Sequence, residues 1–386
     1  MSEHSTLAGG SIIERRMKCL PSYKLEEASP EQGSSKFAIE GTMLHSVVQR
    51  CVDEELDPIK LTGYSEGGAV MTADLAIEMV APALALLEQL LDAYGVDEYE
   101  IVTEARVRYE GMEAFGTCDI LISTPRYVFI IDWKFGRGVV VRGGPANRQL
   151  RFYAGAAMET VPQYFEGDKQ IVLAIIQPAA DEPLTHGIIE RKVLEDWIAE
   201  MRHAIRRILA DDVGDPVTGK HCRWCRAAPT CSAKRGEVEA ALAFDPRGTG
   251  IDPVEFGEML TQADSVESWA KAVRQAAYNE MVKGRPINGY KLVERRPTRK
   301  WSDADAACAA LLEAGINEVF EEKLISPAKA EKAVKSTGGD PKDLADLIVK
   351  ESSGLTIATA DDKRPAVFKN GVRSATPQEL KLEKAT

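Results

Sequence analysis

The chain has 386 residues, 44% of them hydrophobic and 28% charged, which is ordinary for a globular protein and long enough for two domains. Its net charge of −12 argues against a protein that coats DNA nonspecifically, but it is compatible with an enzyme whose basic residues gather in one groove. No apolar run is long enough to span a bilayer and the N-terminus lacks the apolar core of a signal peptide, so we expect a cytoplasmic protein.

Hydrophobic spacing predicts the order of the elements. Residues 1 to about 35 are polar and are expected to form loops, and helices are expected from about Gly41 and over about 71–94. Three strand-like runs separated by short turns then predict an antiparallel meander: "EIVTEARVRYE", "GTCDILIST" and "YVFIIDWKF". A helix, a strand and a helix follow: "NRQLRFYAGAAMETV", "KQIVLAIIQP" and "VLEDWIAEMRHAIRRILA". These elements predict an α/β fold.

The character of the sequence changes after Lys234. We expect residues 1–235 to form one domain, residues 236–375 a mainly helical accessory domain, and residues 376–386 a charged, disordered tail. The stretch "GYKLVERRPTRKW" offers phosphate contacts and a base-stacking ring at Trp301, although a solvated basic face around a buried tryptophan explains it equally well. Its basic residues are Lys291, Arg295, Arg296, Arg299 and Lys300.

The apolar run "VFIIDWKFGRG" ends with Asp132 and Lys134 two residues apart, and therefore on the same face of a strand. The preceding turn places Asp119 roughly across from the end of this strand. Two carboxylates that lie so close repel each other, so a divalent cation is the natural partner, and oxygen ligands favour Mg²⁺ or Mn²⁺. Such an ion generates hydroxide from water and offsets phosphate charge, while Lys134 would position the water or stabilise the phosphorane. The simpler alternative is a surface salt bridge of Asp132.

Three further features add to this pattern. His45 lies one helical turn after Gly41, and imidazole suits Mn²⁺ better than Mg²⁺. Glu104 is an acid inside the first strand of the meander, where an exposed strand position is the simpler interpretation. Gln149 and Tyr153 share one helix face, where ordinary packing of the tyrosine is the alternative.

In this order the motifs resemble the PD-(D/E)XK nuclease superfamily, specifically its RecB-like exonuclease branch. The matching residues are Gly41 and His45, Glu104, Gly116 and Asp119, Asp132 and Lys134, and Gln149 and Tyr153. The resemblance implies a restriction-endonuclease-like core, in which helices flank a mixed central sheet, and metal-dependent DNA cleavage, by exonucleolysis rather than endonucleolysis. It assigns metal binding to His45, Asp119, Asp132 and the Trp133 carbonyl, catalysis to Lys134, Asp119, Asp132 and Glu104, and DNA positioning to Gln149 and Tyr153. The loop from Gly136 to Gly144 is expected to be flexible and to lie near the site, where Arg137 and Arg142 would meet phosphates.

Cys222, Cys225 and Cys231 follow the spacing C-x₂-C-x₅-C, which predicts a metal or cluster site rather than unrelated cysteines. Zinc with His221 as fourth ligand is one alternative, but His221 directly abuts Cys222, which is poor geometry for one small ion. The resemblance to RecB-like nucleases implies instead that Cys19 joins the three to hold a 4Fe–4S cluster. Such a cluster would tie the N-terminus to the end of the nuclease domain. We expect the other cysteines in the core: Cys51, Cys118 and Cys308.

Nearly the whole chain also resembles an uncharacterised family of phage and prophage proteins. This resemblance is carried by "CLPSYKL", "EGTMLH", "DWKFGRG", "QLRFYA", "CRWC", "GYKLVERRPTRKW" and "DDKRPAV". It implies the cytoplasm of a bacterial host, a role in phage DNA recombination or replication, and no membrane partner. The implied partners are linear or single-stranded DNA ends and phage single-strand-binding or annealing proteins. Two other functions stay open, a catalytically silent DNA-binding or recombination scaffold and a zinc-binding interaction protein.

Overall fold

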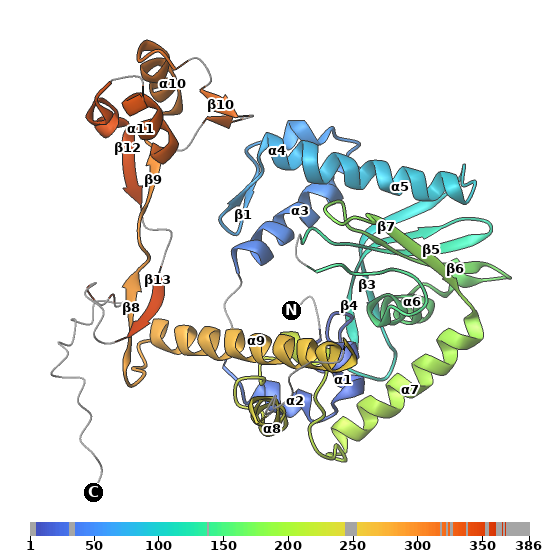
Figure 1. The fold of residues 1–386 in the computed structure, drawn as a ribbon. Coiled ribbons are helices and arrows are strands. Elements are labelled where there is room, and N and C mark those ends of the chain that lie inside the picture. Colours follow the sequence, from blue (N-terminus) through green and yellow to red (C-terminus); the bar gives the residue numbers. More distant parts are fainter. Residues whose placement is uncertain are drawn as a thin grey trace, which may run out of the picture. The chain divides into compact units, whose positions relative to one another are not determined.

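The computed structural model describes residues 5–30, 35–136, 139–243, 253–316, 319–321, 323–324, 327–336, 339–351, 355–359, 365 and 367 (Figure 1). The chain divides into two compact units, Met1–Ala272 and Val273–Thr386. The predicted boundary after residue 235 stays a prediction, and the predicted disordered tail over residues 376–386 lies outside the described residues. Within the described parts, no helix combines the length and apolar character needed to cross a membrane.

A five-stranded mixed sheet forms the centre of the first unit, in the order β3-β4-β5-β6-β7 (Figure 1). The predicted antiparallel meander is present as β3 (Glu100–Arg108), β4 (Phe115–Ser123) and β5 (Tyr127–Trp133). Strand β6 (Gln170–Ile176) runs parallel to β5, and α6 (Arg148–Thr160) provides the crossover that a parallel pair requires. Strand β7 (Leu184–Ile189) is antiparallel to β6 and was not predicted. The α/β fold with a mixed central sheet flanked by helices is confirmed.

Helices cover both faces of the sheet. One face packs against α3 (Lys36–Asp53) and α5 (Ala81–Ala93), and the other against α1 (Ile13–Lys18), α6 and α7 (Arg191–Leu209) (Figure 1). Strand β5 is buried on both faces, which explains its continuous apolar run. The remaining elements of this unit are α2 (Ser22–Glu27), η1 (Pro58–Leu61), β1 (Ser65–Glu66), β2 (Ala69–Val70), α4 (Ala73–Leu75), η2 (Ala76–Val80), η3 (Pro162–Phe165), η4 (Lys220–Trp224), α8 (Ser232–Leu242) and most of α9 (Pro253–Val282).

The N-terminal region contains two short helices, α1 and α2, where the sequence predicted loops. That expectation is wrong for residues 13–18 and 22–27. The physical reason is that buried ion pairs help to hold the helices: Arg15 Nη2 lies 3.1 Å and Arg16 Nη1 2.7 Å from the carboxylate of Glu26. These charged side chains look solvent-exposed in the sequence, although all three are buried in the structure.

Helix caps fix where the two helices nearest the predicted site begin. Helix α3 starts at Lys36, earlier than predicted, because the Ser35 hydroxyl accepts a hydrogen bond from the Ala38 N–H at 3.1 Å. The Asn147 side chain caps α6 by accepting a hydrogen bond from the Leu150 N–H at 3.0 Å. This cap places Gln149, one of the predicted site residues, in the first turn of α6.

The second unit contains helices, as predicted, together with strands that were not predicted. Its helices beyond α9 are α10 (Ala304–Glu313), α11 (Pro327–Ser336) and η5 (Pro341–Leu347). Its antiparallel pairs are β8 (Tyr290–Glu294) with β13 (Leu355–Thr359), β9 (Thr298–Trp301) with β12 (Ile348–Glu351), and β10 (Phe320–Glu321) with β11 (Lys323–Leu324). Trp301 and Cys308 pack against its small apolar core, which favours the structural interpretation of Trp301. Arg299 pairs with Glu331.

Candidate metal centre

Three side chains from three elements meet at one point of the first unit. His45 on α3, Glu104 on β3 and Asp119 on β4 each offer one ligand atom, and these atoms all lie within 4.8 Å of one another. In an octahedral site with bonds of about 2.1 Å, neighbouring ligand atoms lie about 3 Å apart and opposite ones about 4.2 Å apart. A small movement of these three side chains toward one another would therefore let them bind one divalent ion. One imidazole nitrogen and two carboxylates match the preferences of Mn²⁺ and, less closely, Mg²⁺. The donor set therefore fits the metal that the sequence predicts.

A break in the sheet ladder brings Glu104 and Asp119 into this position. Strands β3 and β4 pair on both sides of these two residues but not at them. Side chains before and after the break lie on opposite faces of the sheet: Ile101 and Ile120 toward α3, and Ala105 and Cys118 toward α6. Glu104 has a φ of 46°, a left-handed conformation that costs a residue with a side chain about 1–2 kcal/mol. Strain of this kind accompanies functional sites in many proteins.

The electrostatic environment keeps Asp119 ionised. His45 Nδ1 lies 3.4 Å from Asp119 Oδ2, and the Trp133 N–H donates to the same oxygen at 2.7 Å. Burial alone would raise the pKa of Asp119, but the charge and hydrogen bond of His45, with Lys134, hold it below its usual value. Burial by itself would lower the pKa of His45, but the charge and hydrogen bond of Asp119 outweigh burial and raise this pKa above its usual value. Metal binding requires ionised carboxylates, so Asp119 is in the required state at neutral pH.

Trp133 contributes its N–H to the site, and the role of its carbonyl as a metal ligand stays a prediction. The ring of Trp133 is buried in the core between the sheet and α3. The ring of Phe135 makes an edge contact with the His45 ring, with centroids 5.4 Å apart. These contacts fix the orientation of the imidazole and of the Asp119 carboxylate.

Asp132 lies beside the three-residue set but does not belong to it. Its Oδ2 lies 2.5 Å from Lys134 Nζ, and its Oδ1 accepts a hydrogen bond from Gln149 Nε2 at 2.7 Å. Burial raises the pKa of Asp132 to about 6, whereas the charges of Asp132 and Asp119 outweigh burial and raise the pKa of Lys134. The carboxylate of Asp132 is only 2% exposed, so this pair is not the surface salt bridge of the simpler alternative. A metal-ligand role for Asp132 stays a prediction.

Gln149 connects Asp132 to Tyr153, because its Nε2 also lies 3.4 Å from the tyrosine hydroxyl. Tyr153 is 3% exposed and its ring lies against Gly10, where an added Cβ would come within 2.5 Å of the ring. The structure therefore places Tyr153 in the core, in contact with Gln149. Contact of either residue with DNA stays a prediction.

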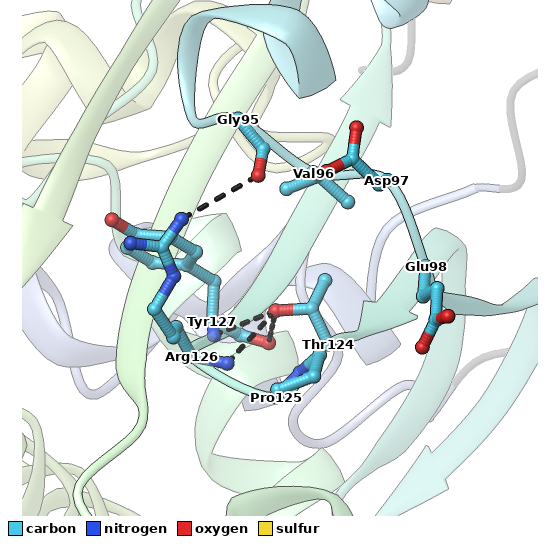
Figure 2. Close-up of a pocket in the computed structure, with 8 residues that line it drawn as sticks. All are labelled: Gly95, Val96, Asp97, Glu98, Thr124, Pro125, Arg126 and Tyr127. Carbon is cyan, nitrogen blue, oxygen red and sulfur yellow. Dashed lines mark hydrogen bonds between the residues drawn. The ribbon is translucent and has the colours of Figure 1, made fainter.

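A cavity of about 250 Å³ lies at the turn that begins β5, at the other end of the strand from Asp132 (Figure 2). It is lined by residues 95–98 and 124–127, and the Arg126 guanidinium donates to the Gly95 carbonyl at 3.4 Å. None of the predicted site residues lines this cavity. The candidate centre is thus separate from it.

A family model described as "Protein of unknown function (DUF2800)" matches residues 4–365. The chain is a DUF2800 protein. The expected membership of an uncharacterised family over nearly the full length is confirmed, while the phage or prophage origin stays a prediction. Among solved structures, the crystal structure of SSO0001 is 12% identical, covering 58% of the DUF2800 chain and 95% of that chain with a TM-score of 0.23. A TM-score that low supports no argument about fold or function.

Two distant parts of the DUF2800 chain bring Cys19 close to Cys222. Helix α1 packs against η4, which puts Cys19, directly after α1, near Cys222. Burial is the main cause of the raised pKa of Cys222, and Cys19 adds to the rise. Burial, followed by the charge of Glu26, raises the pKa of Cys225 to about 11. Cys231 lies at the N-cap of α8. Cys51 and Cys118 are buried at 5% and 0% exposure, as expected of core residues.

The predicted DNA-contacting loop of the DUF2800 chain is only partly described. Arg137 lies outside the described residues, and Arg142 pairs with Glu182. The Gly143 N–H donates to the Thr185 hydroxyl at 2.7 Å, and a Cβ at Gly143 would come within 2.0 Å of the Thr185 carbonyl. The backbone of the loop therefore approaches β7 closely at Gly143 and is hydrogen-bonded to it there, and the expected flexibility of the loop stays a prediction.

Glu26 links distant segments of the DUF2800 fold, a role that was not predicted. Besides its two arginine partners, its Oε1 accepts a hydrogen bond from the Arg226 N–H at 2.9 Å, 200 positions along the chain. Arg226 directly follows Cys225, so this bond fixes the cysteine loop to α2. No sequence signal distinguishes such a buried glutamate from an exposed one.

Proposed function

We propose that this protein is a metal-dependent deoxyribonuclease that hydrolyses phosphodiesters, acting as an exonuclease on linear or single-stranded DNA ends in phage recombination or replication. The observation that carries the proposal is the convergence of His45, Glu104 and Asp119 within 4.8 Å, beside the Asp132–Lys134 pair. The α/β core with a mixed central sheet agrees with the resemblance to PD-(D/E)XK nucleases.

Each residue of the centre has a role that follows from its contacts. His45, Glu104 and Asp119 would hold a Mg²⁺ or Mn²⁺ ion, which supplies Lewis-acid stabilisation and lowers the pKa of water. Lys134 is 26% exposed while its partner Asp132 is buried, so its ammonium can donate to a phosphate oxygen at the surface. Asp132 keeps Lys134 protonated and oriented, and Gln149 keeps Asp132 in place.

The cysteines would hold a 4Fe–4S cluster rather than zinc. Tetrahedral zinc with bonds of about 2.3 Å needs thiolates about 3.8 Å apart. Within the described part of the chain, no three sulfurs of Cys19, Cys222, Cys225 and Cys231 all lie within 4.8 Å of one another. A cluster binds its thiolates on separate irons and so spreads them more widely. The alternative ligand His221 has its Nε2 2.9 Å from the Val217 carbonyl.

Digestion of end-labelled linear DNA with Mn²⁺ tests the proposal. Wild-type protein should shorten the DNA and lose activity in EDTA, and Lys134→Ala should lose on the order of 10²–10³-fold in rate, because one donor to a developing charge is removed. Lys192→Ala is the matched control, since Lys192 is exposed and pairs with Asp196 on its own helix. Equal or absent activity in wild type and Lys134→Ala would support the scaffold function instead.

Anaerobic purification tests the cysteine assignment separately. A brown protein with four irons per chain would support the cluster, and each cysteine-to-serine change should remove the colour. A colourless protein with stoichiometric zinc would support the zinc-binding interaction protein.

A further inference from the structure

Trp224, in the loop between two of the cluster cysteines, is 69% exposed. Tryptophan is buried to a large extent in most proteins, so a ring this exposed needs an explanation. The Arg223 guanidinium lies 5.3 Å from the centroid of the ring. The turn that carries both residues is held by a backbone hydrogen bond of 3.1 Å from the Cys225 N–H to the Cys222 carbonyl. The ring is thus presented on a short, ordered turn.

The charges around this ring are positive and available. Lys220, Arg223 and Arg226 lie within four residues of Trp224 in the sequence. In the described ranges of the chain, none of these three makes an ion pair with a carboxylate, although the protein as a whole has a net charge of −12. An acidic protein that leaves unpaired cations around an exposed aromatic ring offers a surface that suits a polyanion with flat faces.

We propose that Trp224 and Arg223 form a stacking platform for an unpaired base of single-stranded DNA. The platform deepens the proposed nuclease function, on which the choice of DNA as ligand rests. Aromatic rings stack on bases with little dependence on sequence, and arginine adds a cation–π contribution. Lys220 and Arg226 are placed along the loop to meet the phosphates on either side of the stacked base.

A cavity lies between α6 and the segment that precedes the Trp224 turn. It has a volume of about 480 Å³, and its lining includes Asp215 and Val217 of that segment and Arg148 of α6. Arg148 Nη1 lies 3.8 Å from the sulfur of Met17 and, among the described residues, has no carboxylate partner. The next residue, Gln149, binds Asp132. The cavity lining carries charges of both signs, from Lys18, Arg148 and Arg207 and from Glu200 and Asp215.

The platform is tested by fluorescence titration of the full-length, cluster-loaded protein with an unlabelled oligothymidine. EDTA is present so that the oligonucleotide is not cleaved. The oligonucleotide should quench tryptophan emission, and Trp224→Ala should remove most of the quenching and weaken binding on the order of tenfold. Trp224→Phe should retain most of the affinity, because the aromatic face is kept. Visible absorbance and circular dichroism identical to wild type show that each variant keeps its cluster and fold.

Tyr99→Ala is the matched control, because Tyr99 is 48% exposed but lies between Glu98 and Glu100, and its loss should leave binding unchanged. The inference is overturned if Trp224→Ala binds like wild type, if wild type does not bind the oligonucleotide, or if polyglutamate displaces it at equal concentration. If binding depends on Trp224 but the protein shows no Mn²⁺-dependent cleavage, the proposed nuclease function is wrong and the stacking platform is supported. If the protein cleaves DNA but its binding does not depend on Trp224, the nuclease function is supported and the stacking platform is wrong.

Discussion

At the scale of single residues, Glu104 shows how the candidate centre is assembled. Its φ of 46° lies in the left-handed region, within a strand whose neighbours remain paired with β4. A glutamate gains nothing for stability from this conformation, whereas the conformation turns its carboxylate toward His45 and Asp119. Local strain and ligand geometry therefore depend on the same backbone angle.

Replacing Glu104 by glycine or by alanine separates strain from ligation. Both changes remove the carboxylate, but only glycine accepts a positive φ without cost, so Glu104→Gly should be more stable than Glu104→Ala by about 1 kcal/mol. Urea denaturation in EDTA measures the difference. At the exposed neighbouring position Arg106 the order should reverse, since glycine weakens an ordinary strand. An alanine variant at 104 that is as stable as the glycine variant would show that no strain is present.

At the scale of elements, α6 lies so close to its neighbours that only glycine fits at one point. A Cβ on Gly155 would come within 2.3 Å of the Tyr109 hydroxyl and 2.8 Å of Ile198 Cδ1. The same hydroxyl donates to the Phe152 carbonyl at 3.0 Å. This close approach sets the distance of α6 from β3 and α7, and with it the position of Gln149 beside Asp132.

Gly155→Ala should destabilise the protein by about 1–3 kcal/mol, because overpacking outweighs the better helix propensity of alanine. Gly41→Ala is the matched control in α3, since nothing lies within 4 Å of its added Cβ. This variant should gain about 0.5–1 kcal/mol. Thermal unfolding of both variants decides the question, and a stabilised Gly155→Ala would contradict the packing described for α6.

The elements around the sheet could largely be predicted, because each carried a clear period of hydrophobic residues. The meander, α6, β6 and α7 were found in this way. Strand β7 was missed because only Ile189 among its residues is buried. Helices α1 and α2 were missed because buried charges help to hold them. For the centre, residue types and their order predicted His45, Asp119 and Glu104. The sequence shows neither the break in β3–β4 pairing that brings these residues together nor the fact that Asp132 lies outside the set.

At the scale of the whole molecule, Glu26 ties together segments that lie far apart in the chain. Its carboxylate contacts Arg15 and Arg16 of α1 and the backbone of Arg226 in the cysteine loop. Burial alone would raise its pKa, but the two arginine charges and the hydrogen bonds lower it below its usual value. The ionised carboxylate therefore stabilises the folded state.

Glu26→Gln should lower the free energy of unfolding at pH 7 by about 3–5 kcal/mol, because two buried arginines lose their counter-charge. The folded pKa lies below the unfolded value of about 4.3, so this contribution is complete above that pH and is lost as the pH falls further. Urea midpoints of wild type and variant should thus converge in acid. Glu14→Gln, which breaks an exposed pair with Lys18, should change stability by less than about 1 kcal/mol. A constant difference at all pH values would contradict the role of the ionised form.

Calorimetric titration of the protein with Mn²⁺ tests the central claim most directly, namely that His45, Glu104 and Asp119 form one divalent metal site. Removing a residue that hydrogen-bonds to a metal ligand typically weakens metal binding about 10–100-fold, so removing a ligand itself should weaken binding at least as much. We predict one Mn²⁺ per wild-type chain, no detectable site in Asp119→Asn, and an unchanged site in Asp196→Asn, whose carboxylate is exposed on α7. Equal binding by wild type and Asp119→Asn would contradict the account.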